Sequence, residues 1–295
     1  MMFVSRTAHL IVIVLVASLS AQTAELMLGD ATLLRLRLQK NMTFRYDAET
    51  TTSQQMSVMG QDMTNDIAYS VRISMAVADA TLDRSSITCT FSDAKTSVSV
   101  RGVDENVPGM DTSMSLTQFD GAMMTMTLDP TAKIVSVDRG TNNEASSLFS
   151  SMRIMERINT VFPVNEVRVG DTWVRTVTDT IAAGQGDGTI FTTMNLKNTY
   201  RGVRDTLGFR CWLIDTESTA FDQRGTISTN GIDLEVDGSG VFRSKTFVEA
   251  KTGMTVVTIG DVTSDTRMSV SGQQEMIIPV DTHLTFTVKR RIEKK

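Results

Sequence analysis

The chain has 295 residues, of which 34 are acidic and 29 are Lys or Arg, so it is mildly acidic overall. It has no basic stripe with interleaved aromatic residues, which argues against a nucleic-acid partner. Its two histidines, His9 and His283, are too few to favour a zinc site or Ser-His and Cys-His catalysis. We therefore expect no metal, no cofactor and no catalytic residues.

The first 21 residues have the pattern of an export signal. Arg6 supplies a positive charge, and an apolar run of ten residues follows at Leu10–Leu19. Small residues up to Ala21 suit a signal peptidase. Because about 20 apolar residues are needed to cross a bilayer, this run favours a cleaved signal over the alternative of an uncleaved anchor. We expect a cleaved signal, a periplasmic or secreted protein, and no transmembrane span after cleavage.

The mature chain has the alternation that an antiparallel sheet with one apolar and one wet face requires. Apolar residues alternate with polar ones most clearly over residues 69–75 and 86–92. His283 lies in a similar run, which predicts a surface position on a strand. Residues typical of turns predict hairpins at 80–84, 129–130, 205–208 and 251–253.

Residues 143–159 have helical spacing instead. Their apolar residues recur every three or four positions, at Leu148, Met152, Met155 and Ile158. Pro163 bars continuation of the helix. A second, shorter helix over residues 23–36 is one alternative for the start of the mature chain. The other alternative is that the leucine-rich run of this region opens the first strand.

The two halves of the chain look related. Cys211 lies 122 positions after Cys89, and Val256 lies 122 positions after Ile134. Farther upstream, residues 40–44 match residues 169–173 only if an insertion is allowed. We interpret this as a tandem duplication of one β unit. The predicted organisation is a signal peptide (1–21), a first β repeat (22–140), a linking helix (141–162) and a second β repeat (163–295).

The two cysteines each lie on the apolar side of a predicted strand. In an exported protein Cys89 and Cys211 can form a disulfide, worth up to ~4–5 kcal/mol in the chain-entropy model. The alternative is two separate buried thiols that pack as small hydrophobic side chains. The sequence leaves both open and disfavours a catalytic thiol.

Methionine is frequent, with 19 residues in the chain. Flexible, polarizable thioethers suit an adaptable apolar cavity, although they serve equally as core filler. For a cavity, the predicted ligand-binding residues are Met75, Met124, Met126, Met152, Met155 and Trp173. The run Asp233–Gly240 does not have the spacing of a calcium loop, and it predicts an exposed strand that ends in a glycine turn.

The most distinctive motif is Phe162-Pro163 followed by V-R-V-G-D-T-W at residues 167–173. Gly170 and Asp171 predict a turn, after which Trp173 points inward. The pattern resembles an uncharacterised family of exported bacterial all-β proteins, a domain of unknown function with a V-G-D-x-W motif. This resemblance implies no catalytic residues. In architecture alone, the chain is similar to the LolA-type periplasmic lipoprotein carriers, which implies an open half-barrel.

Together these patterns predict a mainly β fold: a curved, half-barrel-like antiparallel sheet built from two tandem repeats, with one central amphipathic helix. The leading hypothesis is a non-enzymatic periplasmic or envelope-associated protein that binds a hydrophobic or lipid-like ligand in an apolar cavity. The alternative is a structural or assembly module that contacts envelope proteins. A hydrolase built on Asp171, Asp215 or Glu217 would need paired carboxylates, which the sequence does not show.

Overall fold

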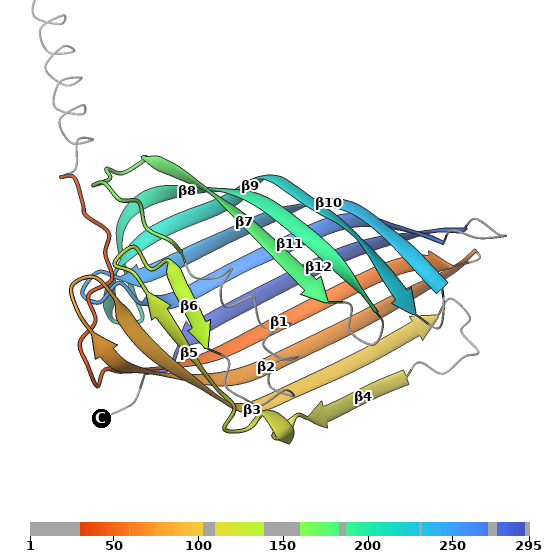
Figure 1. The fold of residues 1–295 in the computed structure, drawn as a ribbon, viewed down its shortest axis with the longest axis horizontal. Coiled ribbons are helices and arrows are strands. Elements are labelled where there is room, and N and C mark those ends of the chain that lie inside the picture. Colours follow the sequence, from red (N-terminus) through yellow and green to blue (C-terminus); the bar gives the residue numbers. More distant parts are fainter. Residues whose placement is uncertain are drawn as a thin grey trace, which may run out of the picture.

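The computed structural model describes residues 30–58, 60–102, 110–138, 160–182, 187–229, 232–270 and 276–292. These residues form one antiparallel sheet of twelve strands (Figure 1). The mainly β prediction is therefore confirmed. The strands are β1 (Thr43–Val58), β2 (Gln61–Ala80), β3 (Ser85–Gly102), β4 (Met110–Ser115), β5 (Met123–Leu128), β6 (Ile134–Asp138), β7 (Thr172–Ala182), β8 (Asp187–Thr206), β9 (Phe209–Thr229), β10 (Ile232–Glu249), β11 (Thr255–Val270) and β12 (Met276–Arg290).

The strand order is β6-β5-β3-β2-β1-β12-β11-β10-β9-β8-β7, and β4 pairs separately with β3. The first strand thus pairs with the last, and the two halves of the chain meet at β1 and β12. The sheet curls strongly on itself (Figure 1). Among the described residues it does not close, because β6 and β7 stand at the two ends of the order. All four predicted turns join successive strands in the structure.

The inner face of the sheet carries the main hydrophobic core. We call the end of the sheet with the β2–β3, β8–β9 and β10–β11 turns the packed end, and the opposite end the open end. Side chains of the inner face fill the packed end because period-2 alternation directs them inward. The most buried members of this core include Tyr46, Ile73, Ile87, Cys89, Phe91 and Leu196.

A second cluster closes the packed end. It is built from the N-terminal segment 30–42, which we call the strap, and from residues 160–171. The strap pairs with the latter at the bridge Thr32–Val167. The ring of Phe162 packs edge-on against Trp212, with centroids 5.9 Å apart. Leu34 of the strap is fully buried in this cluster.

The strap also ties the two halves together. The backbone N–H of Leu36 donates to the carbonyl of Pro130 at 2.8 Å, and that of Arg37 donates to the carbonyl of Thr252 at 2.8 Å. Pro130 and Thr252 lie 122 positions apart, in the β5–β6 and β10–β11 turns. Two adjacent residues of the strap therefore bind matching turns of the two halves.

The entries into β1 and β7 share one hydrogen-bond pattern. Asn41 N–H donates to the carbonyl of Val77, and Val77 N–H donates to the carbonyl of Met42. Gly170 and Asp171 make the same pair of bonds with Tyr200. Asn41 and Gly170 both have positive φ, at 71° and 97°. The matched geometry supports the alignment of residues 40–44 with 169–173, and with it the duplication hypothesis.

Three sequence predictions need correction or comment. The structure contains no α-helix in its described residues, only a 3-10 turn at Thr117–Phe119, and the helix predicted over 143–159 lies outside those residues. The described part of 23–36 is neither helix nor the opening of β1, because its backbone bonds go to turns and to Val167. No helix that the structure describes is long and apolar enough to cross a membrane.

The predicted turn at Gly238–Gly240 is also wrong. β10 runs through these residues to Glu249, with an irregular register between Ser239 and Arg243. A Cβ at Gly240 would lie 2.8 Å from the ring of Phe221, so the missing side chain lets that aromatic ring cover the strand. Glycine here serves close packing on the curved inner face instead of a turn.

Candidate functional site

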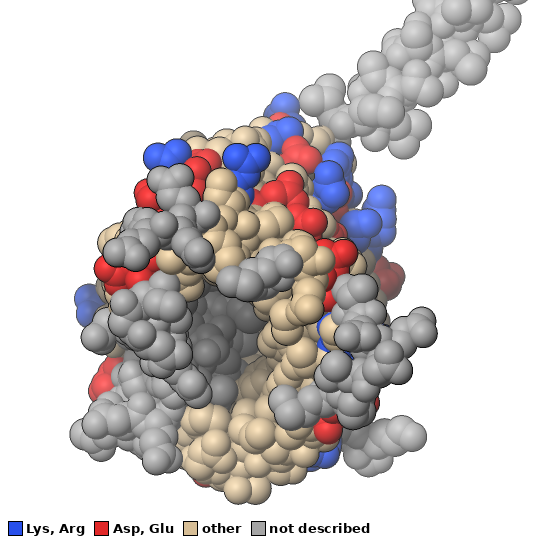
Figure 2. Space-filling view, turned by 90° about the vertical axis from the view of Figure 1, so that its right-hand side faces the viewer, with Lys and Arg blue, Asp and Glu red and all other residues tan. Residues whose placement is uncertain are grey.

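The open end of the sheet is hollowed. Figure 2 looks into this end, where the walls of the curved sheet surround a hollow and charged side chains lie on the outer surface. Burial along the strands agrees with this view. Inner-face residues at the packed end are almost fully buried, whereas those toward the open end are mostly half-buried. Among the described residues, the inner face is therefore packed more tightly at one end than at the other.

Half-buried side chains of five strands form what we call the inner wall of the hollow. The register places them in phase with the core residues of the packed end. They come from β1, β2, β3, β11 and β12: Thr50, Thr52, Gln54, Asn65, Ile67, Tyr69, Val98, Val262, Thr282 and Leu284. Hydroxyl and amide groups alternate here with aliphatic and aromatic groups, so the wall is amphipathic.

None of these ten residues carries a charge at neutral pH. Burial raises the pKa of Tyr69 to about 12, so its hydroxyl stays protonated. Inner-face charges lie elsewhere in the described chain, for example at Arg175 and Asp179 of β7 and at Arg290 of β12. Burial lowers the pKa of Arg175 to about 10. The inner wall thus favours an uncharged or apolar partner over an ion.

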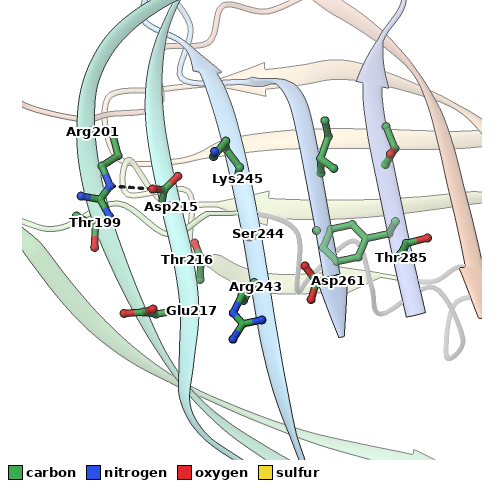
Figure 3. Close-up of a pocket in the computed structure, with 14 residues that line it drawn as sticks. Thr199, Arg201, Asp215, Thr216, Glu217, Arg243, Ser244, Lys245, Asp261 and Thr285 are labelled. Atoms are coloured by element: carbon green, nitrogen blue, oxygen red, sulfur yellow. Dashed lines mark hydrogen bonds and ion pairs between the residues drawn. The ribbon is translucent and has the colours of Figure 1, made fainter. Parts of the chain in front are cut away.

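The outer face of β8–β12 carries a second candidate, a groove of about 650 Å³. Figure 3 shows its charged side chains, with Arg201 paired to Asp215 at 2.7 Å. A row of alternating charge runs in register from Lys197 beside the groove to three residues that line it: Glu217, Arg243 and Asp261. Because these opposite charges lie beside one another, the groove has no net charge to attract an ion.

The groove also decides the carboxylate hypothesis. Asp215 accepts from Arg201, and Glu217 accepts from Lys197 at 3.0 Å. Asp171 lies in the turn before β7, where it accepts from the backbone N–H of Arg168 at 2.8 Å. Two of the three carboxylates are thus held in surface ion pairs and the third stabilises a turn. This arrangement gives no support to a carboxylate hydrolase.

The methionines predicted to bind a ligand lie in the packed core. Met75, Met124 and Met126 are 5–7% exposed. Cys89 separates the first two in register across β2, β3 and β5. Met152 and Met155 lie outside the described residues. The three described methionines belong to the main core cluster, which fits the core-filler interpretation.

Trp173 points inward from β7, as predicted, but it belongs to the cluster at the packed end. Its indole N–H donates to the carbonyl of Val161 at 2.8 Å, and its own carbonyl accepts from the side chain of Asn198. These bonds fix the segment before β7 against β8. The predicted ligand residue thus has a structural role in the described contacts.

The disulfide considered from the sequence does not form. Cys89 and Cys211 are free and buried, and they belong to different clusters. Cys89 packs in the main core between Ile87 and Phe91. Cys211 packs with Val256 and Val257. The alternative of two separate buried thiols is the one that the structure bears out.

Sequence reasoning missed the inner wall because its polar members do not look like a binding site. Thr52, Gln54 and Asn65 fall in phase with the core residues of their strands, and this phase was the available signal. Extending the alternation of residues 69–75 toward the N-terminus of β2 would have placed Ile67 and Asn65 on the inner face. His283 is exposed, as predicted.

Comparison with known proteins adds little to this geometry. No family model matches the chain, and neither does any curated protein. Among solved structures, the translocator domain of autotransporter NalP from Neisseria meningitidis aligns with a TM-score of 0.18 and 6% identity. The alignment covers 93% of this chain and 96% of that chain. At this TM-score the likeness carries no argument about fold or function.

Proposed function

We propose that this protein is a non-enzymatic binding protein of the cell envelope that holds a hydrophobic or lipid-like ligand in the hollow of its curved sheet. The observation that carries the proposal is the inner wall, whose residues stay half-buried while the same phase is fully packed at the other end. Cavities of mixed aliphatic and hydroxyl lining, closed at one end, are typical of small-molecule sites.

The place of action is part of the same proposal. The export signal at residues 1–21 is read from the sequence and lies outside the described residues. A protein that works in the periplasm or at the envelope meets lipids and other amphiphiles, which water solubilises poorly. A hollow of this kind would remove their apolar surface from water, at ~25 cal/mol per Å².

The first test is to look for a resident molecule. The full chain is expressed with its signal, purified without detergent from the periplasm, and measured by native mass spectrometry before and after extraction with organic solvent. We expect an additional mass that the extraction removes and that contains an apolar chain. A single apoprotein mass in every preparation would contradict the proposal.

The second test uses a probe and a matched pair of variants on β2. Ile67 lies on the inner wall and its neighbour Ala68 is exposed on the outer face. The fluorescent apolar probe N-phenyl-1-naphthylamine should bind the parent chain and the Ala68→Arg variant equally. Ile67→Arg places a charge in the hollow, and we expect it to weaken probe binding at least about tenfold because the charge must be desolvated. Equal binding by both variants would place the probe outside the hollow.

An assembly role is the second candidate, and one observation favours it. Large apolar side chains are exposed along the segment leading into β7, where Val164, Val169 and Val174 are 74%, 56% and 64% exposed. Exposed apolar residues that gather on one segment often mark a protein contact. In-cell crosslinking from Val164 and Val174 should then trap an envelope protein. The same crosslinks would be absent if the protein acts alone as a carrier.

A further inference from the structure

A belt of uncharged polar side chains crosses the inner wall. Asn65 on β2 pairs in register with Gln54 on β1, Gln54 pairs with Thr282 on β12, and Thr282 pairs with Ser264 on β11. Four adjacent strands thus carry amide and hydroxyl groups side by side on the inner face, where Ser264 is buried and the other three residues are half-buried. We call these four residues the polar belt.

Mainly apolar rows lie on both sides of the polar belt. Toward the packed end the next inner row is Ile67, Thr52, Leu284 and Val262. Toward the open end the next inner row is Met63, Met56, Val280 and Thr266, in which the methionines are half-buried and the other two residues are buried. The belt is therefore a continuous polar row between two rows that each hold three apolar side chains and one threonine, as a site for a molecule with one polar portion would require.

One atom of the belt lacks a hydrogen-bond partner. The Oδ1 atom of Asn65 is buried, and in the described structure no group donates to it. A buried carbonyl oxygen without a partner costs roughly 1–3 kcal/mol. Gln54 and Thr282 are half-buried in the same row, so a molecule in the hollow can reach them.

We infer that the polar belt binds the uncharged, hydroxyl- or amide-bearing head of an amphiphile, with the apolar tail along the neighbouring rows. This inference rests on the proposed function and specifies its ligand class. A charged head is disfavoured because no belt residue carries a compensating charge, and an unpaired ion inside the sheet would lose its hydration. A ligand with no polar group would leave the belt without partners.

The experiment compares three amphiphiles that share one tail. Decyl maltoside, decyl sulfate and decyltrimethylammonium, all below their micelle-forming concentrations, compete with N-phenyl-1-naphthylamine for the full chain. We expect decyl maltoside to displace the probe at a concentration at least about tenfold lower than either charged amphiphile requires. Equal displacement by all three would overturn the head-group inference and leave the proposed function standing. Failure of the probe to bind at all would instead overturn the proposed function.

A matched pair of variants on β1 assigns the preference to the belt. Gln54 faces the hollow, and its neighbour Gln55 is exposed on the outer face. We expect Gln54→Leu to weaken the binding of decyl maltoside about tenfold without weakening the binding of the probe, which has no polar head. Gln55→Leu should change neither affinity. Thr282→Val, which removes one hydroxyl on another strand, is the second variant should Gln54→Leu not fold. Unchanged maltoside binding in a folded belt variant would overturn the inference.

Discussion

Cys89 and Cys211 show how burial, as the largest cause, sets the reactivity of a thiol. Burial raises the pKa of the Cys89 thiol to about 12 and that of Cys211 to about 11. The reactive species of a cysteine is its thiolate, so both groups are inert while they stay in the folded interior. This burial also protects the two unpaired thiols from forming wrong disulfides.

The first prediction concerns these thiols. Near pH 8 a thiol with a pKa of about 12 is ionised in only about one molecule in ten thousand. We expect Ellman's reagent to leave the native protein unlabelled over minutes and to titrate both cysteines at once in guanidinium. Rapid labelling of the native chain would contradict the burial. A denatured, unreduced chain with no titratable thiol would show that the disulfide forms after all.

At the scale of elements, the turns before β1 and β7 have the same geometry from different residues. Asn41 reaches its positive φ of 71° in the small left-handed region that asparagine tolerates. Gly170 has a φ of 97°, beyond that region, and a Cβ there would meet nothing within 4 Å. The requirement for glycine at position 170 is therefore one of backbone conformation alone.

The second prediction separates the two turns. Gly170→Ala should lower the free energy of unfolding by about 1–3 kcal/mol, because alanine must adopt a strained φ. Asn41→Gly should change it by less than about 1 kcal/mol, since glycine adopts the same φ freely. Urea unfolding of both variants measures the difference. Equal losses would mean that the hydrogen bonds to Val77 and Tyr200, rather than the backbone φ, determine how much each turn contributes to the free energy of unfolding.

A buried ion pair joins the ends of several strands at the packed end. Arg290 of β12 donates to Glu249 of β10 at 2.8 Å, and both side chains are at most 13% exposed. The same guanidinium donates to the carbonyls of Met254 and Thr255 and lies 4.9 Å from the centroid of the Phe44 ring. The guanidinium of Arg290 therefore contacts the ends of β1, β10 and β11 as well as its own strand, β12.

The third prediction follows from that geometry. Arg290→Met leaves the Glu249 carboxylate buried with a hydrogen bond from the Thr252 hydroxyl but without its cation, so it should cost about 3–5 kcal/mol of unfolding free energy. The control is Lys197→Met, which removes an exposed pair with Glu217 and should cost less than about 1 kcal/mol. Chemical denaturation at constant ionic strength compares the two. A cost below 1 kcal/mol for Arg290→Met would show that water reaches Glu249.

Much of the sheet could be predicted from particular residues. Alternation over 69–75 placed Val71 and Ile73 correctly on the inner face, and the matched runs 40–44 and 169–173 have matched bonds. The inward-facing residues of the long strands were harder to predict near the open end. Both faces of the sheet carry polar residues there, so apolar and polar residues no longer alternate clearly. Gln54 and Asn65 look like surface residues in the sequence. The pairing of β1 with β12 and with β2 places both on the inner face.

The sequence could not predict that the two thiols are free, nor which inner-face residues line the hollow. Whether Cys89 approaches Cys211 depends on strand order, since β3 and β9 are separated by five other strands in the sheet. The same order decides which inner residues face filled space. Methionine content pointed to a cavity at Met75 and Met124, yet those residues lie where the sheet is packed.

At the scale of the whole molecule, the proposals depend on a contrast between a filled end and a hollow end of one sheet. Two isoleucines of β2 test this contrast with identical chemistry. Ile73 lies at the packed end and is 1% exposed, whereas Ile67 lies on the inner wall and is half-buried. Both belong to the inner face of the same strand and differ mainly in what lies opposite them.

Truncation to alanine should therefore have unequal effects. Ile73→Ala leaves a cavity among packed side chains and should cost about 2–5 kcal/mol of unfolding free energy. Ile67→Ala removes atoms that already face the hollow, creates no new cavity, and should cost about 1 kcal/mol or less. Equal, large losses in urea unfolding would mean that side chains fill the open end as well. In that case neither the polar belt nor the rows beside it would have room for a ligand.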